Sequence, residues 1–420
     1  MVRFFKNLYD PVILAAVLAA FLLYLGILPV RSPDSFCCLI KNERITRISG
    51  IFCSDPVKQR SGAFYRIDLK TSAASDSDGN ISSCTGKITV LIPSEIAEAY
   101  MPGKLYSESS SCTDLLCEKG YSAELYGYFK KNGTFHVAEG KNIEPKKTFV
   151  TKILRFRSVS RMNFRRIMYA WKDAGGLFLA LISGMREYAD DSLCQNFRKA
   201  GLSHILALSG MHLSLFSGIF FFFSRKFASK RTSEAASIPV IIIFVWFAGV
   251  SPSLFRALLC SLTAVFCTLS GFKSVKMIKI LAFSFIIHVC TRIQDVHNLG
   301  FILSYSALAG ILLSGEIFNL IFSSRLPLWI SEPLGAGSGA QAFTAPVSVM
   351  CTGAFSPVGI IASVTVSPLI SLFIYSGLII MLLCFIFPDF VQTGAFFMKI
   401  LYNVIKQTVR VFAFVPNLTF

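Results

Sequence analysis

The chain has 420 residues, of which 53% are hydrophobic, and its mean hydropathy is +0.59. This composition is too apolar for a soluble protein and is typical of a membrane protein with several spans. The net charge of +17 is unevenly spread: residues 31–144 carry 14 basic and 14 acidic residues, whereas residues 145–231 carry 16 basic and 4 acidic residues. The second segment is therefore where an anionic partner is expected.

An uncharged run of 20 residues, "PVILAAVLAAFLLYLGILPV", occupies positions 11–30. At 1.5 Å per residue its helical length matches a hydrocarbon core of about 30 Å. Residues 1–35 are therefore predicted to form an N-terminal transmembrane helix. Arg3 and Lys6 precede the run, which favours a cytoplasmic N-terminus. A signal peptide is the alternative, but no small-x-small cleavage site follows the apolar run.

Residues 36–145 are predicted to form a small β-barrel outside the membrane. Alternating runs such as "AFYRIDLK" and "GKITVLIP" are typical of strands, and turn-rich stretches such as "SDSDGN" separate them. The stretch "YGYFKKNGTFHV" indicates a hairpin. Cysteines of this region can form a disulfide if the barrel faces an oxidising compartment. The candidates are Cys84, Cys112 and Cys117.

Residues 146–174 are predicted to form a basic amphipathic helix. The stretch 146–172 contains nine basic residues and no acidic one, and its apolar residues recur at helical spacing. This pattern is typical of a helix that lies on a membrane surface.

Residues 175–420 are predicted to form a helical membrane domain. The expected spans are 201–223, 239–271 with an interruption near Pro252, 277–291, 297–322, 368–387 and 394–415. Residues 336–367 are less apolar and rich in Gly, Ser and Pro, so broken or re-entrant helices are expected there. Short basic loops at 224–231 and 273–279 favour cytoplasmic helix ends.

The stretch "GLSHILALSGMHL" places His204, Ser209, Gly210 and His212 inside an apolar segment. On a straight helix the two histidines lie about 12 Å apart along the axis. They are then too far apart for one zinc ion, whose bonds to nitrogen are about 2.0–2.1 Å long. A break at Ser209–Gly210 changes this spacing and creates a helix N-terminus, where N–H groups favour anions. Structural histidines, a metal site and the polar wall of an aqueous path all remain open.

Further polar residues interrupt the apolar region. Arg256 follows Pro252 by four residues. An arginine at mid-membrane costs about 2.5–3.5 kcal/mol on insertion scales and tends to face a cavity, although it can also snorkel to an interface. Asn298 and Ser304 belong to the stretch "DVHNLGFILSYSALAG", where helix capping explains the first polar group equally well. Gln341 needs a partner, which an ordinary interhelical hydrogen bond supplies.

Four segments within residues 175–390 together resemble the signature segments of the ComEC-type competence proteins. In chain order they are "GLSHILALSGMHL", "GVSPSLFRALLC", "DVHNLGFILSYSALAGI" and "AGSGAQAFTAPVSVMCTGAFSPVGIIASVTVSPLI". Ile302 and Ser363 stand where that family usually has Gln and Asn. The resemblance implies an external barrel of the oligonucleotide/oligosaccharide-binding (OB) type. It also implies a channel for single-stranded DNA across the cytoplasmic membrane during natural transformation.

On this resemblance the polar positions of the membrane domain are expected to line the channel. These positions are His204, Ser209, Gly210, His212, Arg256, Asn298, Ser304 and Gln341. The residues expected to bind DNA outside it are Arg155, Arg157, Arg161, Arg165, Arg166, Tyr126 and Tyr128. Binding of anionic lipid is the alternative role of the arginines, and barrel core is the alternative for the tyrosines. No catalytic residue, metal or cofactor is expected.

The resemblance also implies partners and a location. The channel is expected in the inner (cytoplasmic) membrane as a multi-pass protein with its barrel outside. DNA-receptor and pilus components are expected outside, and a helicase and single-strand-binding proteins inside. Many family members carry a metallo-β-lactamase-like domain, whose HxHxDH motif is not found here, so either a separate nuclease acts or the chain accepts DNA that is already single-stranded. The alternatives are an intramembrane metal-dependent hydrolase that uses His204 and His212, and a transporter of a smaller anion.

Overall fold

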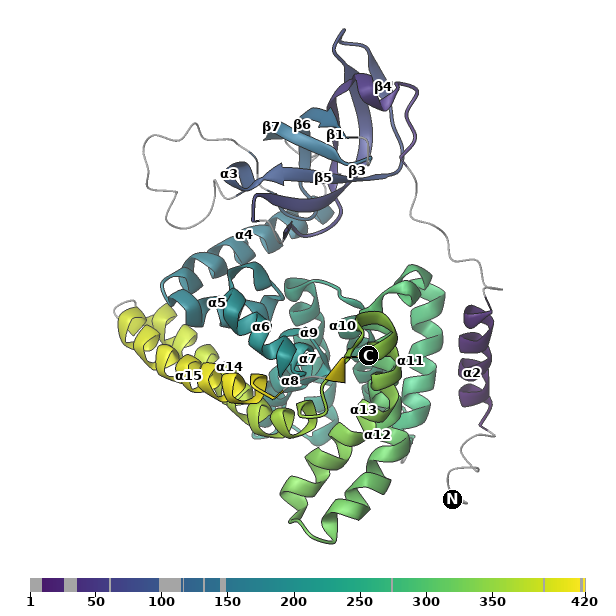
Figure 1. Ribbon diagram of the computed structural model, residues 1–420, viewed down its shortest axis with the longest axis vertical. Helices are drawn as coiled ribbons and strands as arrows, with labels where there is room; N and C mark the ends of the chain where they lie inside the picture. Colours follow the sequence, from purple (N-terminus) through teal and green to yellow (C-terminus); the bar gives the residue numbers. More distant parts are fainter. Residues whose placement is uncertain are drawn as a thin grey trace. The chain divides into compact units, whose positions relative to one another are not determined.

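Figure 1 shows the computed structural model of the chain, coloured along the sequence. The structure describes residues 10–25, 36–59, 62–97, 115, 117–130, 133–143, 149–272, 275–387, 390–415 and 418–419. The chain forms two compact units. One, here named the barrel unit, is Arg31–Ala170; the other, the membrane unit, combines Met1–Val30 with Trp171–Phe420.

Five strands of the barrel unit close into a barrel. They are β1 (Ile45–Phe52), β3 (Phe64–Asp76), β5 (Lys87–Pro93), β6 (Ser122–Phe129) and β7 (Phe135–Asn142). Their order is β1-β6-β7-β5-β3, and β3 pairs back with β1. The β5–β7 pair is parallel and the other pairs are antiparallel. This is an OB-like barrel, as the sequence predicts.

Shorter elements accompany the barrel strands. They are η1 (Asn42–Arg44), β2 (Val57–Lys58), β4 (Ile81–Ser83), α3 (Ser94–Ala97) and α4 (Phe149–Tyr169). Strands β2 and β4 both pair with β3, so they extend the sheet beyond the closed barrel.

Alternation along the strands explains the core of the barrel. In β3, Tyr65, Ile67 and Leu69 are buried, whereas the residues between them are more exposed. Leu125 of β6 belongs to the same apolar cluster. Burying a side chain of this size contributes roughly 1.5–3 kcal/mol. The predicted hairpin forms from β6 and β7, with Gly133 between them at φ 75°, a conformation that glycine adopts without strain.

The membrane unit is built from helices. They are α2 (Pro11–Tyr24), α5 (Lys172–Ser183), η2 (Arg186–Tyr188), α6 (Asp191–Lys199), α7 (Ser203–Leu206), α8 (Gly210–Ser224), α9 (Lys230–Ala248), α10 (Pro252–Leu269), α11 (Met277–Thr291), η3 (Ile293–His297), α12 (Leu299–Ser323), α13 (Leu328–Thr352), α14 (Gly359–Ile386) and α15 (Phe390–Ala413). Two short strands, β8 (Ala354–Phe355) and β9 (Leu418–Thr419), pair antiparallel.

Among the described residues, four helices are long and apolar enough to cross a membrane: α9, α10, α12 and most of α14. Helices α2, α8 and α11 are also apolar but shorter. This composition identifies a membrane protein with several transmembrane helices. Helix α15, which covers the predicted span 394–415, is not among the four. It is amphipathic, because Met398, Tyr402 and Ile405 are buried on one side of the helix whereas Lys399 is exposed.

The Gly- and Pro-rich stretch near the end of the chain forms longer helices than the sequence predicts. Helix α13 continues through Pro333 and Pro346 and ends only at Gly353, which has φ 64°. Helix α12 runs alongside α13 (Figure 1), and a Cβ on Gly310 would overlap the carbonyl oxygen of Gly339. Such close contact between small residues is typical of membrane helices. Packing against neighbours keeps a helix with internal prolines intact in a membrane.

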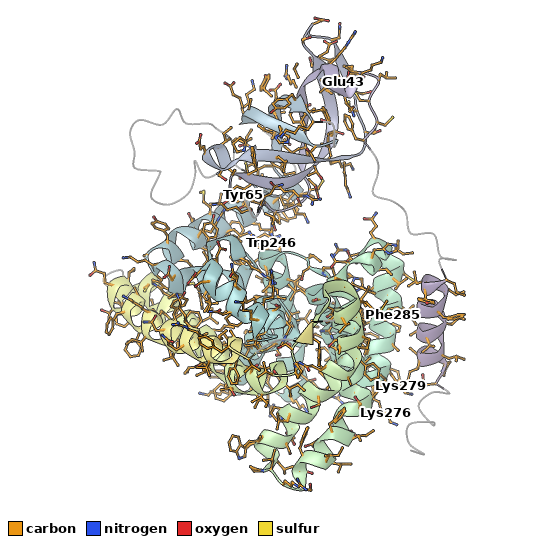
Figure 2. The ribbon with its side chains drawn as sticks, viewed as in Figure 1. Glu43, Tyr65, Trp246, Lys276, Lys279 and Phe285 are labelled. Atoms are coloured by element: carbon orange, nitrogen blue, oxygen red, sulfur yellow. The ribbon has the colours of Figure 1, made fainter. Side chains whose placement is uncertain are left out.

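Helix α2 packs against α11. Asp10 accepts a hydrogen bond from the N–H of Val12 at 3.2 Å, which caps α2, and it forms an ion pair with Lys279 near the start of α11. Figure 2 shows Lys279 on α11 beside α2. Ile13 of α2 packs in one apolar cluster with Ala282 of α11. The two helices therefore begin at the same side of the membrane unit.

Candidate functional site

The predicted span 201–223 is divided into α7 and α8. Ser209 is extended at φ −133° and ψ 176°, and it caps α8. The side chain of His212 is fully buried, and its Nδ1 accepts the N–H of Ser209 at 3.3 Å. Together they form a capping box, with histidine in the place usually taken by Glu or Gln. The unusual residues of this stretch therefore fix the point within the apolar segment at which α8 begins.

Arg256 brings a positive charge to the start of α8. It lies one turn into α10, whose N-terminus is capped by Ser251, which accepts the N–H of Leu254 at 3.3 Å. One guanidinium nitrogen lies 3.6 Å from the position that a Cβ on Gly210 would occupy. The Nε of Arg256 is buried without a hydrogen-bond partner among the described residues. The guanidinium therefore adds to the partial positive charge of a helix N-terminus.

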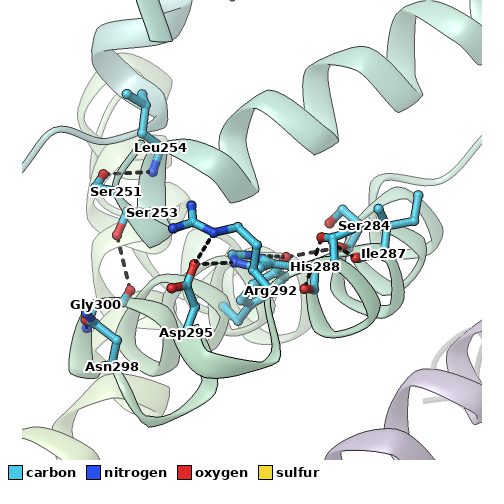
Figure 3. Close-up of polar contacts among 12 residues, drawn as sticks. Ser251, Ser253, Leu254, Ser284, Ile287, His288, Arg292, Asp295, Asn298 and Gly300 are labelled. Carbon is cyan, nitrogen blue, oxygen red and sulfur yellow. Dashed lines mark hydrogen bonds and ion pairs between the residues drawn. The ribbon is translucent and has the colours of Figure 1, made fainter. Parts of the chain in front are cut away.

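The start of α12 joins this region through α10. Ser253 Oγ donates to the carbonyl of Gly300 at 3.1 Å, and Asn298 Oδ1 accepts the N–H of Gly300 at 2.8 Å, which caps α12 (Figure 3). A helix N-terminus carries roughly half an elementary charge. The starts of α8, α10 and α12, together with Arg256, therefore form an electropositive region between apolar helices. This set is named the helix-end region below.

The linker between α13 and α14 forms a second polar region. Gln341 Nε2 donates to the carbonyl of Ser356 at 3.2 Å, and Ser356 Oγ donates to the carbonyl of Lys199 at 3.4 Å. A Cβ on Gly359 would lie 3.1 Å from Gln341 Nε2 and 3.3 Å from the carbonyl oxygen of Gly201. The residues just before α7 therefore contact the start of α14, and Gln341 of α13 finds its partner in the linker rather than on another helix.

The structure gathers part of the predicted channel-lining set. The helix-end region holds Ser209, Gly210, His212, Arg256 and Asn298. Gln341 belongs to the second polar region, and Ser304 is one turn beyond Gly300 on α12. His204 is exposed on α7 and is not brought to His212. In the part of the chain that the structure describes, no group of three His, Cys, Asp or Glu residues is placed to hold a metal ion.

A polar cluster that the sequence analysis missed lies beside the helix-end region. His288, fully buried on α11, has Nε2 3.1 Å from Asp295 Oδ2 and Nδ1 3.2 Å from the hydroxyl of Tyr305. Arg292 Nε lies 3.3 Å from the same oxygen of Asp295, and Figure 3 shows Asp295 facing both basic residues. His288, Arg292 and Asp295 recur at positions i, i+4 and i+7, the spacing of one helix face. This spacing is the feature of the sequence from which the cluster could have been predicted.

The arginines of α4 do not form the free basic surface that the sequence predicts. Arg157 donates two hydrogen bonds to Asp55 at 3.1 and 3.0 Å. Arg161 lies 3.7 Å from both Asp55 and Glu118, and Arg165 pairs with Glu118. The side chains of all three arginines are buried. Because they are four residues apart, they lie on one face of α4, which they attach to the barrel.

Electrostatics support this structural role. Burial alone would raise the pKa of Asp55, but the nearby Arg161 and Arg157 hold it below its usual value. A buried charge of this kind is stable only while its partners remain. Arg157, Arg161 and Arg165 therefore have an internal structural role, and DNA binding by these residues stays a prediction. The side chains of Arg155 and Arg166 lie outside the described set.

One outer face of the barrel carries a row of aromatic rings. Tyr128 of β6 stacks on His136 of β7 with ring centroids 5.7 Å apart, and Phe64 meets His136 edge-on at 5.5 Å. Arg47 lies 5.6 Å above the ring of Tyr126. Tyr128 is 57% exposed. The exposed ring of Tyr128 is therefore able to stack with a planar ligand.

The cysteines of the barrel are grouped differently from the prediction. Cys84 lies against Cys38, with the two sulfurs 2.7 Å apart. Burial and the neighbouring Cys38 raise the pKa of the Cys84 thiol to about 12. Cys117 is a buried free thiol, and Cys112 lies outside the described residues. The predicted grouping therefore omitted Cys38, the cysteine that contacts Cys84.

Comparisons with known proteins bear on the membrane unit. A family model described as "Competence protein" matches residues 181–420, which include every residue of the helix-end region. The chain belongs to the competence protein family. It is also similar to ComE operon protein 3 of Bacillus subtilis (strain 168), with 26% identity over 153 residues. That match spans 36% of this chain and 20% of the relative, and no solved structure matches the chain significantly.

The membrane unit therefore carries most of the resemblance to a family that is described by its link to competence. The family match begins within α5 and runs to the last residue, so it covers both polar regions and the His288 cluster. The barrel unit lies outside the matched residues. Its OB-like fold rests on its own strand order.

Proposed function

We propose that the chain is a channel that conducts single-stranded DNA across the cytoplasmic membrane during natural transformation. The observation that carries the proposal is the helix-end region, where three helix starts and Arg256 meet inside a competence-family membrane unit. Helix N-termini and guanidinium groups both favour phosphate. A conducted strand must also be released, and one arginine with a few partial charges holds it less tightly than a dense ring of cations.

The contact between α2 and α11 supports a membrane orientation for this channel. The ion pair of Asp10 with Lys279 places the start of α2 beside the basic loop at 273–279. Basic loops favour the cytoplasmic side, so the proposal places the N-terminus there. Helices α9 and α11 each follow a basic loop, and α10 and α12 begin where those helices end. The helix-end region then lies toward the outer surface, and the barrel unit follows α2 on the outer side.

The row of rings on the barrel supports a second contact with the strand. Stacking of a base on an aromatic side chain is worth about 1–3 kcal/mol and depends little on sequence. Tyr128 is exposed enough to accept a base, and Arg47 beside Tyr126 offers a charge to the phosphates. The proposal therefore gives the barrel the task of receiving the strand before it reaches the membrane unit.

The surroundings of the channel are part of the same proposal. It assigns the chain transport alone, without a hydrolytic step or a cofactor. A receptor and pilus components deliver DNA from outside, a separate nuclease supplies the single strand, and a helicase with single-strand-binding proteins collects it inside. The proposed location is the inner membrane.

The deciding experiment measures entry of a fluorescent oligonucleotide into vesicles that contain the full chain, scored as protection from added nuclease. Hydrogen bonds to charged groups contribute about 1.5–3 kcal/mol, so Arg256→Ala is expected to reduce entry ~10- to 100-fold. The matched control is Arg325→Ala, because Arg325 is exposed in the turn between α12 and α13 and should leave entry unchanged.

Undiminished entry in Arg256→Ala would overturn the proposal. Entry of inorganic phosphate or a nucleoside monophosphate without entry of the oligonucleotide would favour the transporter of a smaller anion. Substitution of Tyr128 by Ala tests the barrel separately. It should weaken oligonucleotide binding by the full chain without changing the structure of the membrane unit.

A further inference from the structure

His288 is a fully enclosed titratable side chain beside the helix-end region. It lies in the last turn of α11 and has no exposed surface. Its ring makes T-shaped contacts with Phe255 and Phe301, and the ring centroids are 4.8 Å apart in each pair. Both of its ring nitrogens have polar neighbours, which are Asp295 Oδ2 at 3.1 Å and the Tyr305 hydroxyl at 3.2 Å. An enclosed imidazole with a partner on each nitrogen is held in one orientation, as in sites where histidine handles protons.

Hydrogen-bond accounting gives this imidazole two stable arrangements. A carboxylate only accepts, so Nε2 carries a hydrogen toward Asp295 in both. The Tyr305 hydroxyl has one hydrogen, and in the structure it donates this hydrogen to the Ser284 carbonyl at 3.2 Å. Nδ1 must then donate to the Tyr305 oxygen, which makes the ring an imidazolium. If the hydroxyl turns to donate to Nδ1, the ring is neutral and Ser284 loses that bond. Loss of the proton from Nδ1 is therefore accompanied by rotation of the Tyr305 hydroxyl toward Nδ1.

Charged groups face His288 from the surrounding elements. The carboxylate of Asp295 in η3 attracts a proton on the ring, and the guanidinium groups of Arg292 and Arg256 repel it. Arg292 is also held by Asp295 and lies 5.3 Å above the ring of Phe255. From α10, Cys260 contacts the Ser284 hydroxyl at 3.2 Å. The ion pair that joins α2 to α11 lies near the opposite end of α11.

The same residues are connected to the helix-end region. Asp295 lies in η3, three residues before Asn298, the cap of α12. Gly300 lies in the first turn of α12, and its carbonyl accepts a hydrogen bond from Ser253 of α10. A change in the hydrogen bond between Asp295 and His288 therefore acts on the segment that positions the starts of α12 and α10 (Figure 3).

We propose that His288, Asp295 and Tyr305 form a proton-binding site, and that proton binding there is linked to anion binding at the helix-end region. The proton comes from water, binds at Nδ1 and adds one positive charge beside the anion. An anion and a proton therefore favour each other's binding. The linked anion rests on the proposed function, whereas the proton site rests on the geometry alone.

The test uses the full chain in lipid nanodiscs with ¹⁵N-labelled histidine rings. The chain has five histidines, and His288→Gln identifies the signals that belong to His288. We expect Nδ1 of His288 to change from unprotonated to protonated as the pH falls from about 8 to 5, the range in which histidine titrates. Tyr305→Phe, which removes the acceptor of the Nδ1 hydrogen, should lower the midpoint. An Nδ1 signal that stays constant over this range in the unmodified chain would overturn the site, whatever the variants do.

The linkage is tested by adding a thymidine oligonucleotide to the same sample. Coupling between two sites typically changes affinity about 5- to 150-fold, which corresponds to a rise in the midpoint of about 0.7–2 pH units. His297→Gln is the matched control, since His297 is exposed in the same segment and should leave this rise unchanged. A midpoint that the oligonucleotide does not move overturns the linkage. Failure of DNA conduction itself is read separately, from entry of the oligonucleotide into vesicles.

Discussion

The arginines of α4 and Arg256 are buried in opposite ways. Arg157, Arg161 and Arg165 meet two carboxylates of the barrel unit, whereas Arg256 faces the start of another helix in the membrane unit. A guanidinium whose partners are fixed carboxylates stabilises a structure and has little left to offer a ligand. A guanidinium beside a helix N-terminus remains attractive to a passing anion. The number of basic residues in a segment therefore says less about anion binding than the partners of each one.

The largest loss of stability is expected when the barrel unit loses a carboxylate from this network. Removing one partner of a buried ion pair costs about 3–5 kcal/mol, because the other charge stays buried. Glu118→Ala should therefore destabilise the barrel by this amount, since both Arg161 and Arg165 contact Glu118. Hydrogen exchange of the barrel strands in the full chain measures the effect.

The matched control is Arg47→Ala, because the Arg47 side chain is 42% exposed and its partner Glu124 keeps a second ion pair with Lys141 at 3.4 Å. A pair that reaches water contributes less than a buried one, so exchange should change less than in Glu118→Ala. Equal effects of Glu118→Ala and Arg47→Ala would contradict the view that α4 is held by a buried network.

A smaller effect is expected from acid. The pKa of Asp55 is held below its usual value by Arg161 and Arg157 against the opposing effect of burial. Its ion pairs therefore stabilise the barrel unit fully above the unfolded pKa of about 3.9, and this contribution is lost as the pH falls through the lower folded pKa.

Thermal unfolding of the full chain between about pH 3 and 7 detects this loss. Asp55→Asn should remove that part of the acid dependence, whereas Asp78→Asn, in an exposed turn, should retain it. An unchanged acid dependence in Asp55→Asn would show that other carboxylates are responsible.

The smallest effect on stability is expected at Arg256, where the effect on transport is largest. Arg256→Met keeps the apolar stem and removes a charge from the membrane unit. Replacing a buried charge by an apolar group of similar volume is often neutral or stabilising. Thermal unfolding of the full chain should therefore show no loss of stability, even though oligonucleotide entry falls. A pronounced loss of stability would mean that Arg256 holds the helices together and would break the comparison with α4.

The barrel could be predicted largely from its sequence. Alternation in stretches such as that around Tyr65 gives the strands, and the turn at Gly133 gives the hairpin. The parallel pair β5–β7 and the closure of β1 on β3 depend on contacts between distant segments, which alternation does not encode. The arginine stripe of α4 was visible in the spacing of its residues, but its partner Asp55 lies 102 residues away in the chain.

The candidate site could be predicted in part. The break at Ser209 follows from a Ser-Gly pair in an apolar run, and the structure adds that His212 is the partner that fixes it. The prolines of α13 suggested broken helices, but α13 is continuous and packs closely against α12, where Gly310 meets the carbonyl of Gly339. His288 was missed because a single histidine near the end of an apolar run has no distinctive neighbour until α12 folds back and brings Tyr305 to it.

The contact between α2 and α11 sets an order of assembly. Asp10 is synthesised early, but its ion-pair partner Lys279 follows 269 residues later in the chain. At about 5–20 residues per second, synthesis takes ~15–50 s to cover this interval. All barrel strands and α4 are completed within it, so the barrel can fold while α2 still lacks its neighbour. Helix α2 is thus synthesised before the barrel but docks after it, and it tethers a folded barrel to a membrane unit that is still being built.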